Sequence, residues 1–116
     1  MATLVETIAA IARDEPASMA FWSPRGTWSF GELMDAVDRA ASALAAADVA
    51  IGDRVACLTK HTAECVVLTL AANQVGAVCM PVNWRLAPPE LEYIVNNGKA
   101  KVLMADTAFV EVARAL

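Results

Sequence analysis

The sequence has few glycines, and they lie too far apart to form a phosphate-binding loop. The five glycines occupy positions 26, 31, 52, 76 and 98 of the 116 residues. Neither a GxGxxG nor a GxxxxGK[ST] pattern can be read from these positions, so no segment is predicted to wrap its backbone amides around a phosphate chain. We therefore expect no cofactor-binding residue of these two kinds in this chain.

Motifs for metal binding and nucleophilic catalysis are also missing. The only histidine, His61, has no second histidine as a metal partner and no serine or cysteine nucleophile at motif spacing. We expect a capping or surface role for it. Cys57, Cys65 and Cys79 contain no CxxC pair, and each lies in or beside an apolar run. This pattern favours buried free thiols in a reducing compartment. We expect no metal ligand and no catalytic residue here.

Basic residues are scattered singly and form no stripe. Nine bases against thirteen acids give a net charge of −4, so nucleic acid is not expected as a partner. Residues 1–13 carry no basic region before an apolar core, so a signal peptide is not predicted there. The apolar run 65–82 is interrupted by Asn73, Gln74 and Pro81, and a membrane span is not predicted from it. We expect a soluble, cytoplasmic protein.

Apolar residues are abundant for so short a chain. They make up 58% of the sequence, against 19% charged residues. A small soluble domain has much surface for its volume and should be more polar. The excess suggests a face that packs against more protein, although many of these residues are alanines that would suit close helix contacts. The chain also stops at Leu116 without a polar tail, which we interpret as truncation.

Hydrophobic spacing and turn residues predict alternating helices and strands. A hairpin is expected over 18–22 and 27–30, with its turn at 24–26. The clearest helix covers 30–47, because apolar positions follow a helical period and Ser29 with Glu32 forms a capping box. Further helices are expected at 3–13, 62–75, from Pro88 to about Asn97, and 107–115, and further strands at 54–59, 77–82 and 101–105.

After the hairpin, short apolar strands are therefore separated by helices. This order predicts an α/β fold in which a doubly wound, mostly parallel sheet carries helices on both faces.

Two pairs of neighbouring residues are candidates for a binding role. Trp84 and Arg85 lie in the loop after a predicted strand, where an aromatic ring beside a cation can form a substrate-binding surface. Packing of Trp84 against a neighbouring helix is the favoured alternative. Asp53 and Arg54 could act as an acid and a clamp, but a Gly-Asp turn followed by the first residue of a strand explains them better.

Several short stretches, taken together and in order, resemble the start of the adenylate-forming, AMP-binding superfamily that includes acyl-CoA synthetases. Each stretch alone is weak, whereas the ordered set with matching separations is specific. Within this superfamily, the residues at 83–86 and the spacing most resemble the fatty or medium-chain acyl-CoA ligases. Two positions depart from the family pattern: Asp48 replaces a glycine, and His61 replaces a capping asparagine. The stretches are SFGEL at 29–33, GDRVA at 52–56, Glu64, GAVCMPVN at 76–83 with Arg85-Leu86, Glu90-Leu91 and KVL at 101–103.

The resemblance implies a two-step reaction for the full-length enzyme. A carboxylate attacks the α-phosphate of Mg-ATP to give an acyl-adenylate and pyrophosphate, and the CoA thiol then displaces AMP. The family residues that bind ATP and Mg2+, and the lysine of a mobile C-terminal domain, lie beyond the position of Leu116. Residues 1–116 would then be a truncated N-terminal subdomain of a larger multi-subdomain enzyme, inactive alone. Its partners would be the second N-terminal subdomain, the C-terminal domain and a carboxylic acid substrate, a fatty acid first of all.

Two other interpretations remain open at the level of the sequence. The chain could be a complete small α/β binding or interaction module without catalysis. A flavodoxin-type domain would need a phosphate loop after its first strand, and residues 59–62 make a poor one. The fragment interpretation predicts an exposed apolar patch of more than a few hundred Å2 and self-association of the isolated chain.

Overall fold

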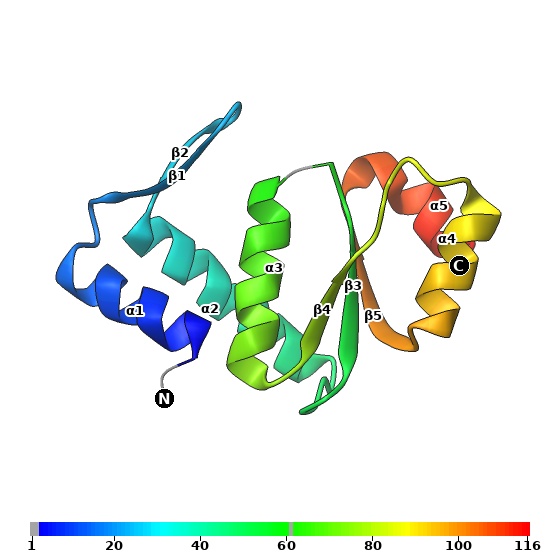
Figure 1. Ribbon diagram of the computed structural model, residues 1–116, viewed down its shortest axis with the longest axis horizontal. Coiled ribbons are helices and arrows are strands. Elements are labelled where there is room, and N and C mark those ends of the chain that lie inside the picture. Colours follow the sequence, from blue (N-terminus) through cyan, green and yellow to red (C-terminus); the bar gives the residue numbers. More distant parts are fainter. Residues whose placement is uncertain (1–2, 61) are drawn as a thin grey trace.

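The computed structural model describes residues 3–60 and 62–116. Figure 1 shows a central sheet with helices on both sides and a hairpin that projects from one end. The elements in chain order are α1 (Leu4–Asp14), β1 (Met19–Ser23), β2 (Gly26–Ser29), α2 (Phe30–Ala46), β3 (Arg54–Leu58), α3 (Thr62–Val75), β4 (Val78–Pro81), α4 (Pro88–Asn97), β5 (Ala100–Ala105), the 3-10 helix η1 (Thr107–Phe109) and α5 (Val110–Arg114).

Capping residues set the beginnings of the first two helices. The Ser29 hydroxyl accepts the Glu32 N–H at 3.1 Å, and the Glu32 carboxylate accepts the Ser29 N–H at 2.9 Å. This is the predicted capping box, and it starts α2 at Phe30. Thr3 caps the beginning of α1 with a single bond, since its hydroxyl accepts the Glu6 N–H at 3.2 Å.

The main sheet is parallel and has the strand order β4-β3-β5. The chain runs from β3 through α3 to β4, and then returns through α4 across β3 to β5. Because such crossovers are right-handed, two crossovers in opposite directions place their helices on opposite faces. Figure 1 shows α3 with α1 and α2 on one side of the sheet, and α4 with α5 on the other. The predicted doubly wound α/β fold is confirmed.

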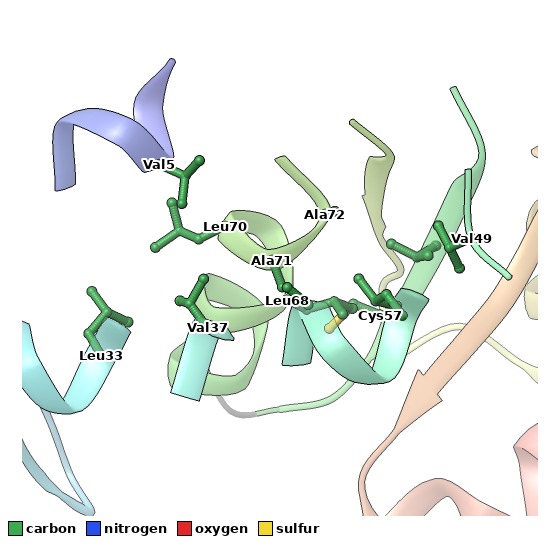
Figure 2. Close-up of a cluster of buried hydrophobic side chains, with 12 residues drawn as sticks. Val5, Leu33, Val37, Val49, Cys57, Leu68, Leu70, Ala71 and Ala72 are labelled. Atoms are coloured by element: carbon green, nitrogen blue, oxygen red, sulfur yellow. The ribbon is translucent and has the colours of Figure 1, made fainter. Parts of the chain in front are cut away.

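Strand β3 alternates between two hydrophobic clusters, one on each face of the sheet. Val55 and Cys57 belong to the larger cluster, with residues of α1, α2 and α3. Figure 2 shows Cys57 of β3 within this cluster, beside side chains from the helices. Ala56 and Leu58 belong to the smaller cluster, which is completed by Val82 and by residues of α4, β5 and α5.

Helices therefore cover both faces of the sheet, and the surface open to further packing lies outside these two faces (Figure 1). The accessible surface is 7000 Å2, whereas a monomer of 12.3 kDa should expose about 6,100 Å2. The Cα radius of gyration is 14.7 Å, against about 13.4 Å for a compact chain of this length. The exposed large apolar side chains are Leu4, Met19, Trp22, Ile51, Val78 and Tyr93.

The structure corrects two details of the sequence-based prediction. The last helix begins as the 3-10 helix η1, because the Asp106 carboxylate accepts the Ala108 N–H at 3.0 Å and its carbonyl accepts the Phe109 N–H at 3.0 Å. Only one of the three cysteines is fully buried, since Cys65 and Cys79 are partly exposed.

Other expectations are confirmed or cannot be assessed. Asp48 has a left-handed backbone, with φ of 61°, a conformation that aspartate adopts more readily than most residues. The capping or surface role expected of His61 concerns a residue outside those described. Within 3–60 and 62–116, no helix is long and apolar enough to cross a membrane.

Candidate functional site

The carboxyl ends of the three parallel strands bring four side chains from distant segments together. Lys60 follows β3, Trp84 and Arg85 follow β4, and Phe109 follows β5. We call these four residues the carboxyl-end cluster. In open α/β sheets, ligands bind outside the carboxyl ends of the strands, where neighbouring connections leave toward opposite faces. The cluster therefore lies where a ligand is expected for this topology.

The Trp84 ring is the centre of the carboxyl-end cluster. The Lys60 ammonium lies 4.5 Å from the ring centroid, and the Arg85 guanidinium carbon also lies 4.5 Å from it. Both distances allow cation–π attraction. The Phe109 ring packs at a tilt of 42°, with its centroid 6.3 Å from that of Trp84. Trp84 is half-buried against the smaller hydrophobic cluster, so the favoured packing role is confirmed, and a substrate contact stays a prediction.

A hydrogen-bonded turn holds Arg85 in this position. The Asn83 side-chain oxygen accepts the Arg85 N–H at 3.0 Å, and the Asn83 carbonyl accepts the Leu86 N–H at 3.1 Å. Such a turn is typical of asparagine, whose short amide can bond to the backbone two residues later. Leu86 then packs against the smaller hydrophobic cluster. The Asn-x-Arg-Leu sequence thus fixes the loop and leaves Arg85 at the surface.

Both cations of the cluster are exposed to solvent. The ion pairs recorded for the described part of the chain involve other residues, namely Arg25 with Glu64, Lys101 with Asp53 and Arg114 with Glu111. Two exposed cations lie beside one aromatic ring, and the nearby Asp106 carboxylate accepts the Thr59 hydroxyl at 2.7 Å. The two cations suit an anionic group, such as a carboxylate or a phosphate.

A hollow of about 470 Å3 adjoins the cluster at Lys60. It lies between the hairpin and the beginning of α3, and Phe21, Trp22 and Lys60 are among its lining residues. The Arg25 guanidinium bonds to the Glu64 carboxylate at 3.0 Å and ties the hairpin to α3. A larger hollow of about 640 Å3 is lined mainly by α1 and α2 and contains no residue of the cluster.

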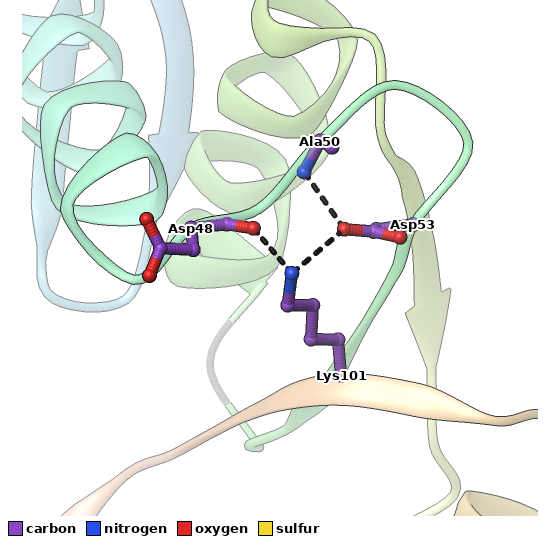
Figure 3. A network of polar contacts seen from close by, with 4 residues as sticks. All are labelled: Asp48, Ala50, Asp53 and Lys101. Atoms are coloured by element: carbon purple, nitrogen blue, oxygen red, sulfur yellow. Dashed lines mark hydrogen bonds and ion pairs between the residues drawn. The ribbon is translucent and has the colours of Figure 1, made fainter.

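The opposite end of the sheet carries a network that is closed on itself. In Figure 3 the Asp53 carboxylate accepts the Ala50 N–H at 2.7 Å and the Lys101 ammonium at 3.2 Å, while Lys101 also donates to the Asp48 carbonyl. The Ala50 N–H, and next to it Lys101, lower the pKa of Asp53. Arg54 starts β3 and donates to the Gly98 carbonyl at 2.9 Å. The turn and strand roles expected for Asp53 and Arg54 are thus the ones observed.

Sequence reasoning singled out Trp84 and Arg85 but missed Lys60 and Phe109 as their neighbours. The sequence did carry one signal for Lys60, because it directly follows a predicted strand, and Trp84 and Arg85 lie shortly after another. The described residues contain no group of three or more His, Cys, Asp or Glu side chains that could hold a metal ion.

Residues 7–116 match the family model described as AMP-binding enzyme. A fatty acid–[acyl-carrier-protein] ligase, ScoC of Streptomyces coeruleorubidus, is 35% identical over 92% of this chain and 21% of its own length. An indoleacetate–CoA ligase of Aromatoleum aromaticum is 36% identical over 83% of the chain and 19% of its own length.

A solved structure of the N-terminal domain of FACL13 from Mycobacterium tuberculosis matches 99% of this chain with a TM-score of 0.91 and 29% identity. The match covers 29% of that structure, and the chain spans about a fifth of the length of both curated relatives. A family model that covers 7–116, together with this fold, identifies the family: the chain belongs to the AMP-binding enzymes.

Proposed function

We propose that residues 1–116 form the N-terminal subdomain of an ATP-dependent acyl-CoA synthetase. The enzyme converts a carboxylic acid and ATP into an acyl-adenylate and pyrophosphate, and then transfers the acyl group to CoA with release of AMP. The observation that carries this proposal is the match of 7–116 to the AMP-binding family. It is supported by two relatives that are both named as ligases joining a carboxylic acid to a thiol carrier.

The rest of the enzyme is the partner that this segment requires. About 900 Å2 of accessible surface beyond the size expectation, and the exposed apolar residues Met19 and Trp22 on the hairpin, support packing against further protein. In the proposed enzyme, a second N-terminal subdomain and a C-terminal domain carry the groups that bind ATP, Mg2+ and CoA. We accordingly assign no catalytic step to the described residues, and we expect the isolated segment to be inactive.

The carboxyl-end cluster is the part of this segment that we assign to the substrate cavity. Lys60, Trp84 and Arg85 present two positive charges and an aromatic face at the carboxyl ends of the strands, where a ligand is expected. They would form part of the cavity wall and attract an anionic group of a substrate. The enzyme would act in the cytoplasm.

A fatty acid is the substrate that we propose first, and the test compares acids of different shape. The expressed gene product is incubated with Mg-ATP and either fatty or aryl acids, and pyrophosphate release is measured with and without CoA. We expect release that depends on the acid and on ATP, thioester formation only when CoA is present, and higher kcat/KM for fatty acids. Absence of pyrophosphate release with every acid would contradict the proposed reaction, and a preference for aryl acids would overturn the substrate class.

The intact mass of the expressed gene product separates this proposal from a stand-alone binding module. A mass several times 12.3 kDa supports a subdomain of a larger enzyme, whereas a mass of 12.3 kDa would replace catalysis with a binding or structural role. The same experiment can include residues 1–116 alone. We expect this piece to self-associate through its exposed hairpin, and a monodisperse monomer in analytical ultracentrifugation would contradict that expectation.

A further inference from the structure

Two cysteine side chains face each other across the boundary between strand β3 and helix α3. The Sγ atoms of Cys57 and Cys65 lie 2.9 Å apart. A disulfide needs a sulfur–sulfur distance of about 2.05 Å, so the two atoms must approach by only about 1 Å. Cys57 is inside the larger hydrophobic cluster, as Figure 2 shows, and Cys65 packs against this cluster.

The two residues differ in their access to solvent. Cys57 exposes 1% of its surface, whereas Cys65 is partly exposed near the beginning of α3. Burial, and then the contact with Cys65, raise the pKa of the Cys57 thiol. Because the thiolate is the reactive form of cysteine and oxidation requires access, Cys65 is the residue that an oxidant reaches first. Cys57 then lies in position to resolve the product.

We propose that Cys57 and Cys65 form a reversible intramolecular disulfide when the protein meets a hydroperoxide. The Cys65 thiolate attacks one peroxide oxygen, the O–O bond breaks, and Cys65 becomes a sulfenic acid while hydroxide leaves. The Cys57 sulfur then attacks the Cys65 sulfur, the S–O bond breaks, and water leaves with the Cys57 proton. In total, two thiols and one hydrogen peroxide give one disulfide and two waters, and an external thiol reverses the reaction by exchange.

This bond would close the connection that carries part of the candidate site. Residues 58–64 lie between the two cysteines, and among them Lys60 contributes one of the two cations over the Trp84 ring. A disulfide would restrict the connection between β3 and α3, and with it the movement of Lys60. The pair is thus a modification site located next to the carboxyl-end cluster.

The experiment uses the full expressed gene product and locates each cysteine separately. The reduced protein is treated with hydrogen peroxide, quenched with catalase, alkylated with N-ethylmaleimide under denaturing conditions and digested for mass spectrometry. We expect the Cys57 and Cys65 peptides to be joined and unalkylated, and dithiothreitol to restore both thiols. The Cys79 peptide should be alkylated throughout.

Matched variants test the assignment of the pair. Cys79→Ser should form the same disulfide as the wild type, whereas Cys65→Ser should leave Cys57 fully alkylated after peroxide. Cys57→Ser should let Cys65 proceed to sulfinic acid, because no resolving thiol remains. The proposal is overturned if wild-type Cys57 stays alkylated, if Cys65 is linked to Cys79, or if the bond joins two molecules. Peptide mapping of the wild type decides the question even if a variant fails to fold.

Discussion

The two ends of the parallel sheet differ in how their charged groups are used. At the amino end, Asp53, Lys101 and the Asp48 carbonyl satisfy one another. At the carboxyl end, Lys60 and Arg85 lie over the Trp84 ring, and both remain exposed. The same strands therefore end in a closed structural network on one side and in two exposed cations over an aromatic ring on the other.

This difference gives a physical basis for separating structural from functional charges. The partners of Asp53 include a backbone N–H of its own loop, so its carboxylate helps to hold the turn that leads into β3. The Arg85 side chain is not needed to hold its own turn, because the side chain of Asn83 does so through the Arg85 N–H. Charges that the local fold does not require are available for a ligand.

The largest effect on stability is expected from Trp84→Ala. The substitution removes a half-buried ring that packs against the smaller hydrophobic cluster and Phe109. We expect the free energy of unfolding to fall by about 2 kcal/mol, less than for a fully buried tryptophan. Urea denaturation would measure it. Trp22→Ala is the matched control, because that ring is 68% exposed. An equal loss of stability in both variants would contradict a packing role for Trp84.

A smaller effect is expected at the amino end from Gly76→Ala. Gly76 has φ of 81°, and an added Cβ would lie 2.9 Å from the Ile51 Cγ1 atom. We expect a loss of about 1–2 kcal/mol from the left-handed backbone, measured by the same denaturation. Ile51→Ala alone should be nearly neutral because this side chain is 87% exposed. If Gly76→Ala combined with Ile51→Ala were as stable as the wild type, the contact with Ile51 rather than the left-handed backbone would explain the loss.

The smallest effect is expected from Asp53→Asn, and it depends on pH. The pKa of Asp53 is lowered in the folded protein. The ionised carboxylate therefore adds to stability at pH values above its ordinary pKa of 3.8, and this contribution disappears as the pH falls through the lowered pKa. The Tm of the variant should be below that of the wild type at pH 7, and the two should converge below pH 3.8. Asp38→Asn, an exposed position on α2, is the control. A constant difference at every pH would contradict a role for the charge.

Much of the fold could be predicted because its signals are local. The capping box fixes the start of α2 from two residues, and the predicted bounds of α3 are the ones observed. Alternation of apolar strands with helices was sufficient for the fold class. The form of the last helix was missed because it depends on how the Asp106 side chain turns toward the Ala108 N–H, which hydrophobic spacing does not report.

The candidate site could be predicted only in part, because its contacts are long-range. Trp84 and Arg85 are neighbours in sequence, but Lys60 joins them only because β3 and β4 are adjacent in the sheet. The contact of Cys57 with Cys65 likewise depends on how α3 packs on β3. The sequence alone shows that both are cysteines in apolar surroundings, and the expectation that all three thiols are buried was wrong for Cys65 and Cys79.

Steady-state kinetics of two variants would test the central claim most directly. In the expressed gene product, the double variant with Lys60→Ala and Arg85→Ala is compared with Lys101→Ala, using acid-dependent pyrophosphate release and Tm. We predict that loss of the carboxyl-end cations raises KM for an anionic substrate on the order of tenfold, with little change in Tm. Lys101→Ala should lower Tm and leave KM unchanged. If KM rose in Lys101→Ala while the double variant kept wild-type kinetics, the assignment of structural charges to the amino end and of ligand-binding charges to the carboxyl end would be contradicted.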